Sequence, residues 1–170
     1  MKKKIAFLLA MMMLLALAGC GAKVNDHVVD YKIDLPDGFE ETDMDGADAC
    51  WWNPEDGSNV NLVIADKAAT ANAAFKAVTA DILREAVESS LKEVYPTTPT
   101  ITDRFFTKDD VCGLSAYQYS YDLEISGETA TQIIVCINAD KTYTFTYTAS
   151  DDATLKAFEE SAKNIQLTIE

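Results

Sequence analysis

Hydrophobic and polar residues alternate along several short stretches of the chain, a period of two that is typical of half-buried β-strands. In the first stretch, Val28–Leu35, one face carries Val29, Tyr31, Ile33 and Leu35. Similar runs predict further strands at residues 49–53, 60–65, 101–107, 114–125, 129–138 and 142–148, and a short one at 167–169. The chain is therefore rich in predicted strands, most of them in its second half.

Two other stretches carry apolar residues at steps of three and four, the period of an α-helix. The longer one begins at Thr70 or Asn72, either of which is a sound N-cap, and Pro96 ends it. Its apolar side holds Phe75, Val78, Ile82, Leu83, Ala86, Val87, Leu91 and Val94. The second begins at Ser150–Asp152 and carries an apolar stripe of Leu155, Phe158, Ala162 and Ile165. Because the long helix is apolar on one broad side only, we expect it to lie on a sheet.

The turn residues between the later strands predict the register of two antiparallel hairpins. A turn centred on Ser126-Gly127 places Tyr117 opposite Cys136, and a turn centred on Ala139-Asp140 places Cys136 opposite Tyr143. One sheet face then holds Tyr117, Tyr119, Tyr121, Leu123, Ile134, Cys136, Tyr143, Phe145 and Tyr147. Both faces carry apolar groups, so we expect an α+β fold whose antiparallel sheet is covered by helices on both faces.

The order of these elements resembles the PsbP-like group of small α/β/α sandwiches, which includes DcrB-type and other bacterial lipoproteins. The resemblance rests on "YKIDLPDGFEE" (Tyr31–Glu41) near the start and "IVCINADKTYTFTYTAS" (Ile134–Ser150) before the last helix. It covers about Val28 to Ile169 and implies that one domain, residues 28–170, binds partner proteins and is not an enzyme.

The N-terminus has the pattern of a secretion signal. Three lysines, Lys2–Lys4, precede 14 uncharged apolar residues, Ile5–Ala18, which is shorter than the ~20 residues that a membrane span needs. The run ends at Leu17–Cys20, which resembles a bacterial lipobox. This implies that residues 1–19 are a signal peptide cleaved between Gly19 and Cys20, and that the Cys20 sulfur carries a diacylglyceryl thioether, with palmitate as an expected acyl group of the lipoprotein. Residues 20–27 then form the lipidated cysteine and tether. The alternative is an ordinary signal peptide with an incidental cysteine.

Charge limits the classes of partner. Removal of Lys2–Lys4 takes three positive charges from the formal −14 and leaves −17 on the mature chain. Phosphate contacts need Lys and Arg, so we expect no nucleic-acid partner. The expected location is the cell membrane, where the lipid anchor holds the domain on the extracytoplasmic face.

Three cysteines remain after lipidation, so at least one is a free thiol or bonds another chain. The predicted register separates Cys112 from Cys136, which disfavours a disulfide between them. Buried apolar side chains are the favoured interpretation of all three, and a disulfide from Cys50 is the main alternative. No Cys-x-x-Cys occurs, and the only histidine, His27, lies at the tether.

Two features are candidate binding sites. Carboxylates gather in "EETDMDGAD" and "PEDGSN", namely Glu40, Glu41, Asp43, Asp45, Asp48, Glu55 and Asp56. Such oxygens can hold Ca²⁺, with Asp43, Asp45, Asp48, Glu55 and Asp56 as the ligands, but the EF-hand pattern is absent and a solvated acidic loop is favoured. Trp51 and Trp52 must point to opposite faces of one strand. Either both lie in the core, or one is exposed beside the acidic loop and contacts a partner. Tyr117, Tyr119 and Tyr121 recur at every second position and are called the tyrosine row. This row is interpreted as the sheet face beneath the long helix rather than as a platform on which sugars or bases stack.

The leading hypothesis is a lipid-anchored, non-enzymatic module of the cell envelope that binds another envelope protein or a small ligand through a rigid acidic surface. It needs no cofactor. One alternative is a Ca²⁺-dependent structural or adhesion lipoprotein. Another is an envelope hydrolase or redox enzyme that uses Cys50 or paired carboxylates.

Overall fold

The computed structural model describes residues 27–67, 71–95 and 99–170. The predicted signal peptide, the cleavage site at Gly19 and Cys20, and most of the tether lie outside these residues. The described chain folds in the order β1 (Val28–Lys32), β2 (Glu40–Glu41), β3 (Ala49–Trp52), β4 (Asn59–Ala65), α2 (Ala71–Ala77), α3 (Ala80–Val94), β5 (Thr100–Val111), β6 (Leu114–Ile125), β7 (Glu128–Asn138), β8 (Thr142–Ala149), α4 (Asp152–Lys163) and β9 (Gln166–Ile169). No described helix is long and apolar enough to cross a bilayer.

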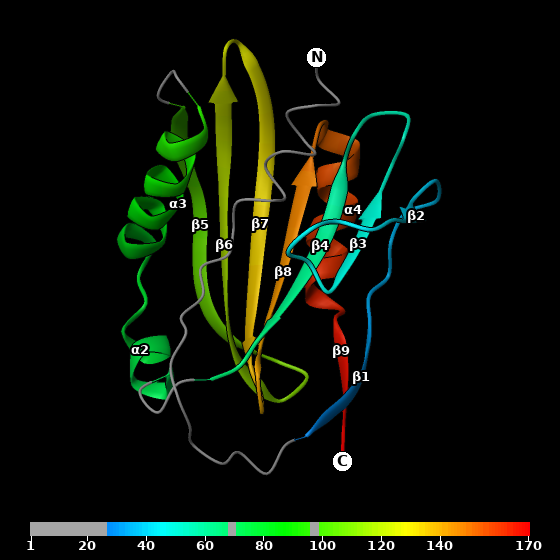
Figure 1. The fold of residues 1–170 in the computed structure, drawn as a ribbon, viewed down its shortest axis with the longest axis vertical. Coiled ribbons are helices and arrows are strands. Elements are labelled where there is room, and N and C mark those ends of the chain that lie inside the picture. Colours follow the sequence, from blue (N-terminus) through cyan, green and yellow to red (C-terminus); the bar gives the residue numbers. More distant parts are fainter. Residues whose placement is uncertain (1–26, 68–70, 96–98) are drawn as a thin grey trace.

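Seven strands form one antiparallel sheet in the order β2-β3-β4-β8-β7-β6-β5. The first and last strands, β1 and β9, pair with each other in a separate antiparallel ribbon. Figure 1 shows that α3 lies beside β5 and β6, at one edge of the sheet, whereas α4 lies near β8 and β4, farther along the strand order. The predicted mixed α/β fold with a mostly antiparallel sheet is confirmed.

The helices pack against different residues of the sheet. Phe75 of α2 and Leu83, Val87 and Leu91 of α3 form one buried cluster with the tyrosines of β6. The other cluster joins Leu155, Phe158 and Ala162 of α4 to the sheet residues Val60, Leu62, Ile133, Val135, Ile137, Tyr143, Phe145 and Tyr147. Alternation along each strand sends neighbouring residues into different clusters.

The register of the β6–β7 hairpin is as predicted. Tyr117 pairs with Cys136 and Tyr119 with Ile134. Ser126 and Gly127 form the two-residue turn with φ angles of 55° and 80°. Both angles lie in the left-handed region, which a two-residue hairpin turn of this kind requires and which suits glycine.

The predicted register of the β7–β8 hairpin was wrong by one residue. Tyr143 pairs with Ile137 rather than with Cys136, because Ala139, Asp140 and Lys141 form a three-residue loop. The Ala139 N–H donates to the Lys141 carbonyl across this loop at 2.9 Å. Since side chains alternate along a strand, the slip exchanges the two faces of β8. Its aromatic residues therefore pack toward α4, and its threonines share a face with the β6 tyrosines.

The predicted long helix is two helices, because the chain leaves the helical conformation at Thr79. This residue has extended angles (φ −130°, ψ 166°) and caps α3 by accepting a hydrogen bond from the Ile82 N–H. The placement of Ile82 in the apolar stripe was also wrong, since its side chain is 49% exposed. Thr79 was overlooked because the apolar spacing continues across the break.

Three strand boundaries also differ from the prediction. The first strand ends at Lys32, and a bulge between Val28 and Asp30 leaves Val29 exposed rather than on the buried face. The acidic segment predicted to be irregular contains the two-residue strand β2. β5 continues to Val111, where Cys112 and Gly113, with φ angles of 47° and 79°, turn the chain into β6.

Candidate functional site

The two tryptophans of β3 point to opposite faces of the strand, and both are half-buried. Trp51 packs against the α4-side cluster and meets the Tyr31 ring edge-on at 6.3 Å. Trp52 lies on the other face, where its neighbours across the sheet are Glu40 of β2 and Asn59 of β4. Each tryptophan pairs with one carboxylate of β2, Trp52 with Glu40 and Trp51 with Glu41, but only Trp51 packs against the α4-side cluster.

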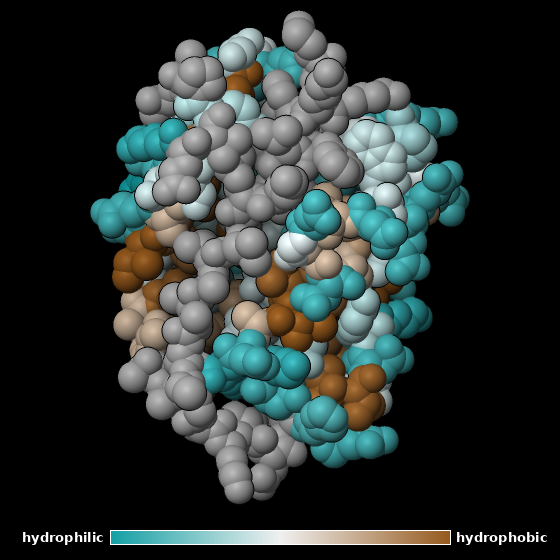
Figure 2. All heavy atoms as spheres, viewed as in Figure 1, coloured by the Kyte–Doolittle hydropathy of each residue, from teal (hydrophilic) through white to brown (hydrophobic). Residues whose placement is uncertain are grey.

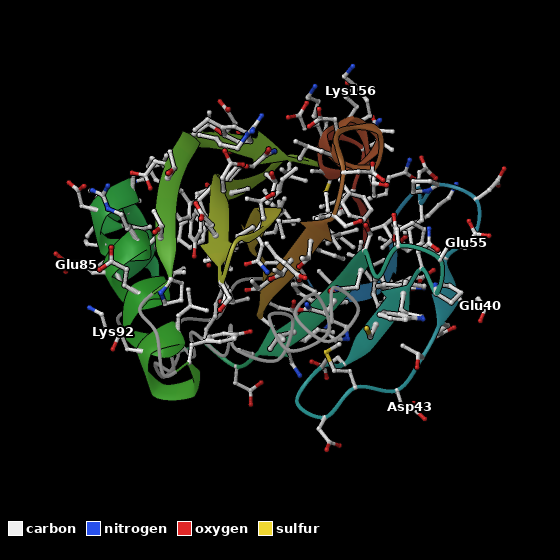
Figure 3. The ribbon with its side chains drawn as sticks, turned by 90° about the horizontal axis from the view of Figure 1, so that it is seen from above. Glu40, Asp43, Glu55, Glu85, Lys92 and Lys156 are labelled. Atoms are coloured by element: carbon white, nitrogen blue, oxygen red, sulfur yellow. The ribbon has the colours of Figure 1, made fainter. Side chains whose placement is uncertain are left out.

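The carboxylates predicted as a group lie around this end of the sheet. Glu40, Glu41, Asp43, Asp45 and Asp48 are all exposed and are called the acidic edge below. In Figure 3, Glu40 and Asp43 point outward beside β2 and β3, as does Glu55 from the next loop. None of the ion pairs between described residues involves the acidic edge. Among the described residues, its negative charge is therefore not paired with a cationic side chain.

Two of the proposed calcium ligands make hydrogen bonds that hold loops in place. Asp48 accepts from the Ile64 N–H at 2.6 Å, which fixes the loop before β3 to β4. Asp56 accepts from both the N–H and the hydroxyl of Ser58, and from Thr154 in α4 at 3.3 Å. Within residues 27–67, 71–95 and 99–170, no three His, Cys, Asp or Glu side chains come together as a metal site.

The three described cysteines are free thiols. Burial raises the pKa of the Cys50 thiol to about 11, and burial also raises the pKa of Cys136. Cys112 was expected to be buried but is exposed, because it occupies the β5–β6 turn. A thiol with a raised pKa stays protonated near neutral pH and is a weak nucleophile.

The tyrosine row lies beneath α2 and α3, as the helical interpretation predicted. Tyr117, Tyr119 and Tyr121 are 3%, 0% and 0% exposed. The Tyr119 hydroxyl donates to Asp103 at 2.6 Å, and the Tyr121 hydroxyl donates to the side-chain oxygen of Gln132. Burial is the main cause that raises the pKa of each hydroxyl above its usual range. These rings are part of the core and cannot serve as an exposed platform.

A row of buried polar side chains continues from the tyrosines toward Trp52. Register places Tyr121, Gln132, Thr148, Asn59 and Trp52 side by side across five strands. Gln132 donates to Thr148 at 2.9 Å. This row was not predicted, because the predicted β8 register was wrong by one residue. The threonines at every second position of residues 142–148 could have indicated a polar face on this strand.

Asn61 lies in the adjacent row, between Cys50 and Thr146. Its side chain is 1% exposed, and its Nδ2 group is buried without a hydrogen-bond partner among residues 27–67, 71–95 and 99–170. Leaving such a donor unpaired costs free energy.

On the α4 side of the sheet, Arg104 and Asp122 pair at 3.2 Å beside an open polar hollow of about 290 Å³.

No protein-family model matches the chain, and no curated protein matches it in sequence. Among solved structures, the cyanobacterial PsbP protein CyanoP from Synechocystis sp. PCC 6803 is similar, with a TM-score of 0.63 and 15% identity over 89% of this chain and 99% of that chain. LpqN, involved in cell envelope biogenesis of Mycobacterium tuberculosis, has a TM-score of 0.45 and 13% identity over 81% of this chain and 83% of its own. The similarity to CyanoP shows that this chain has a PsbP-like fold.

Proposed function

We propose that this protein is a lipid-anchored, extracytoplasmic binding module of the cell envelope, without enzymatic activity. Its domain, residues 28–170, would be an α/β/α sandwich with helices on both faces of the sheet. The lipobox-like residues Leu17–Cys20 support anchoring through lipid on Cys20. The PsbP-like fold supports a binding role, because the family that the chain resembles mostly binds partner proteins.

The acidic edge, with Trp52 beside it, is the surface we assign to the partner. The observation that carries this assignment is the partly exposed Trp52, which lies across the strand pair from Glu40, beside carboxylates that form no ion pair with another described residue. Tryptophan is enriched among the residues that dominate binding energy. Uncompensated charge of one sign speeds encounter with a partner of the opposite sign. The fitting partner is therefore an envelope protein or small ligand that presents positive charge.

Site-specific photo-crosslinking in intact cells tests this surface. A crosslinking residue at Asp43 should capture a discrete partner, whereas one at Glu85, an exposed carboxylate on α3 far from the acidic edge, should not (Figure 3). Trp52→Ala in the Asp43 background should reduce the yield, and raised salt should reduce it further. Capture of the same species from both positions, or of none from Asp43, contradicts the proposal.

Anchoring has a separate test. Intact-mass measurement of the protein from its native membrane should show a chain that begins at Cys20 and carries acyl groups. Cys20→Ala should accumulate with its leader uncleaved, or enter the soluble fraction if another peptidase cuts it. A native polypeptide that still begins at Met1, or that has no acyl modification, refutes anchoring without bearing on the acidic edge.

A further inference from the structure

Two apolar side chains are exposed together where the β1–β9 ribbon ends. Val29 is 45% exposed and Ile169 is 39% exposed. They lie close together, because Ile169 pairs with Val28 and the bulge in β1 turns Val29 outward. Figure 2 shows hydrophobic surface at the lower right, where Figure 1 places this ribbon. The remaining large hydrophobic residue with this exposure in the described chain is Ile82, on α3.

The same end receives the tether. His27, the residue next to β1, accepts a hydrogen bond at its carbonyl from the Glu170 N–H at 2.9 Å. Its ring Nδ1 lies 3.0 Å from Asp140 in the β7–β8 loop. These contacts fix both ends of the described chain to one end of the domain (Figure 1). Any anchor upstream of His27 therefore pulls on this end.

We infer that the β1–β9 end docks on the outer surface of the lipid bilayer, with Val29 and Ile169 reaching the boundary between headgroups and acyl chains. The inference rests on the proposed lipid anchor at Cys20. Between that residue and His27 lie six residues, which span at most ~20 Å. The tether thus keeps the ribbon close to the bilayer. Because the effective concentration of the ribbon at the surface is high, a weak apolar contact forms again after each dissociation without diffusion through bulk solution.

The charges around this end permit the approach. The exposed ionic groups are of both signs: Asp30 and Glu170 are negative, whereas Lys32 and Lys141 are positive and pair with Asp34 and Asp66, so only a small excess of negative charge lies at this end. The acidic edge belongs to β2 and the loop before β3, away from the end of the ribbon (Figure 1). The two half-exposed aliphatic side chains should shift the balance between docked and undocked orientations about tenfold, which corresponds to about 1.4 kcal/mol.

Fluorescence quenching on vesicles tests the orientation. The lipidated protein is reconstituted into phosphatidylcholine vesicles that contain a phospholipid with a nitroxide at its headgroup. Cys112→Ser removes the exposed described thiol, and Val29→Cys, Ile169→Cys or Ile82→Cys then supplies one site for a bimane label. Ile82 is the matched control, because it is equally apolar and equally exposed but lies on α3. We expect at least twofold stronger quenching at positions 29 and 169 than at position 82.

A second experiment tests the apolar contact itself. With the label at Thr168→Cys, an exposed position on β9, the pair Val29→Asp and Ile169→Asp should reduce quenching toward that of position 82. An unchanged melting temperature shows that the fold is retained. Quenching that is equal at all positions, or insensitive to the two aspartates, overturns docking while the anchor stands. Protein that fails to float with the vesicles overturns the anchor, and the docking with it.

Discussion

Two amide side chains on the same sheet face should respond in opposite ways to substitution by leucine. Gln132 is fully buried, donates to the Thr148 hydroxyl at 2.9 Å and accepts from the Tyr121 hydroxyl. Gln132→Leu keeps the size of the side chain but removes both hydrogen bonds. The Thr148 oxygen, 0% exposed, then loses the amide that donates to it, and the Tyr121 hydroxyl loses its hydrogen bond to Gln132.

The expected loss follows from the cost of leaving buried polar groups unpaired, ~1–3 kcal/mol each. For the buried Thr148 hydroxyl and the lost Tyr121–Gln132 hydrogen bond, less the gain from the added apolar surface, we expect the free energy of unfolding to fall by about 1–3 kcal/mol. In a domain of about 150 residues each kcal/mol shifts the melting temperature by roughly 2–4 °C. Thermal unfolding followed by circular dichroism should therefore show a midpoint lowered by about 2–12 °C.

Asn61→Leu is the matched comparison. It removes an Nδ2 group that is buried without a partner, so it should be neutral or stabilise the domain by up to about 2 kcal/mol. Both variants exchange a buried amide for the same side chain in adjacent rows. If Gln132→Leu proves as stable as Asn61→Leu, the buried hydrogen-bond network does not contribute as the structure implies.

Four further outcomes are expected. At pH 8 a thiol reagent should modify Cys112 before the two buried described cysteines, because Cys112 is exposed, although partial burial raises its pKa too. Fast reaction of Cys50, whose pKa burial raises to about 11, would instead support a redox role. Because the pKa of the Cys50 thiol is raised in the folded protein, the contribution of this group to the free energy of unfolding is complete below about pH 9. It should be lost as the pH rises toward 11. Millimolar Ca²⁺ should leave the melting temperature unchanged, since a bound ion would raise it. Thr79→Ala should cost about 1 kcal/mol through the lost cap of α3, whereas Thr79→Asp, which can still cap, should not.

Strand positions were predictable from the sequence, because alternation and turn residues report local backbone geometry. The β6–β7 register was predicted correctly because Ser126-Gly127 marks a two-residue turn. The β7–β8 register was not, because Ala139-Asp140 is compatible with loops of two or three residues. Both faces of β8 suit a buried sheet, so hydrophobicity could not correct the slip.

The candidate site was predictable only in part, for the same reason. The opposite orientation of Trp51 and Trp52 follows from the strand period alone. The row that joins Trp52 to Gln132 depends on register across five strands, which no local pattern encodes. Exposure of Ile82 depends on the break at Thr79, where a capping side chain interrupts an otherwise continuous helical pattern.

The proposed anchor and the charge distribution favour the same orientation. A domain with a formal charge of −17 after cleavage is repelled by anionic headgroups, but at physiological salt this repulsion acts only within a Debye length of ~8 Å. An orientation that places the β1–β9 end on the bilayer moves the acidic edge out of that layer. The tether at His27, the exposed Val29 and the repulsion of the acidic edge thus act together. In that orientation Trp52 and the acidic edge stay accessible to a partner, which links the docking of one end to binding at the other surface.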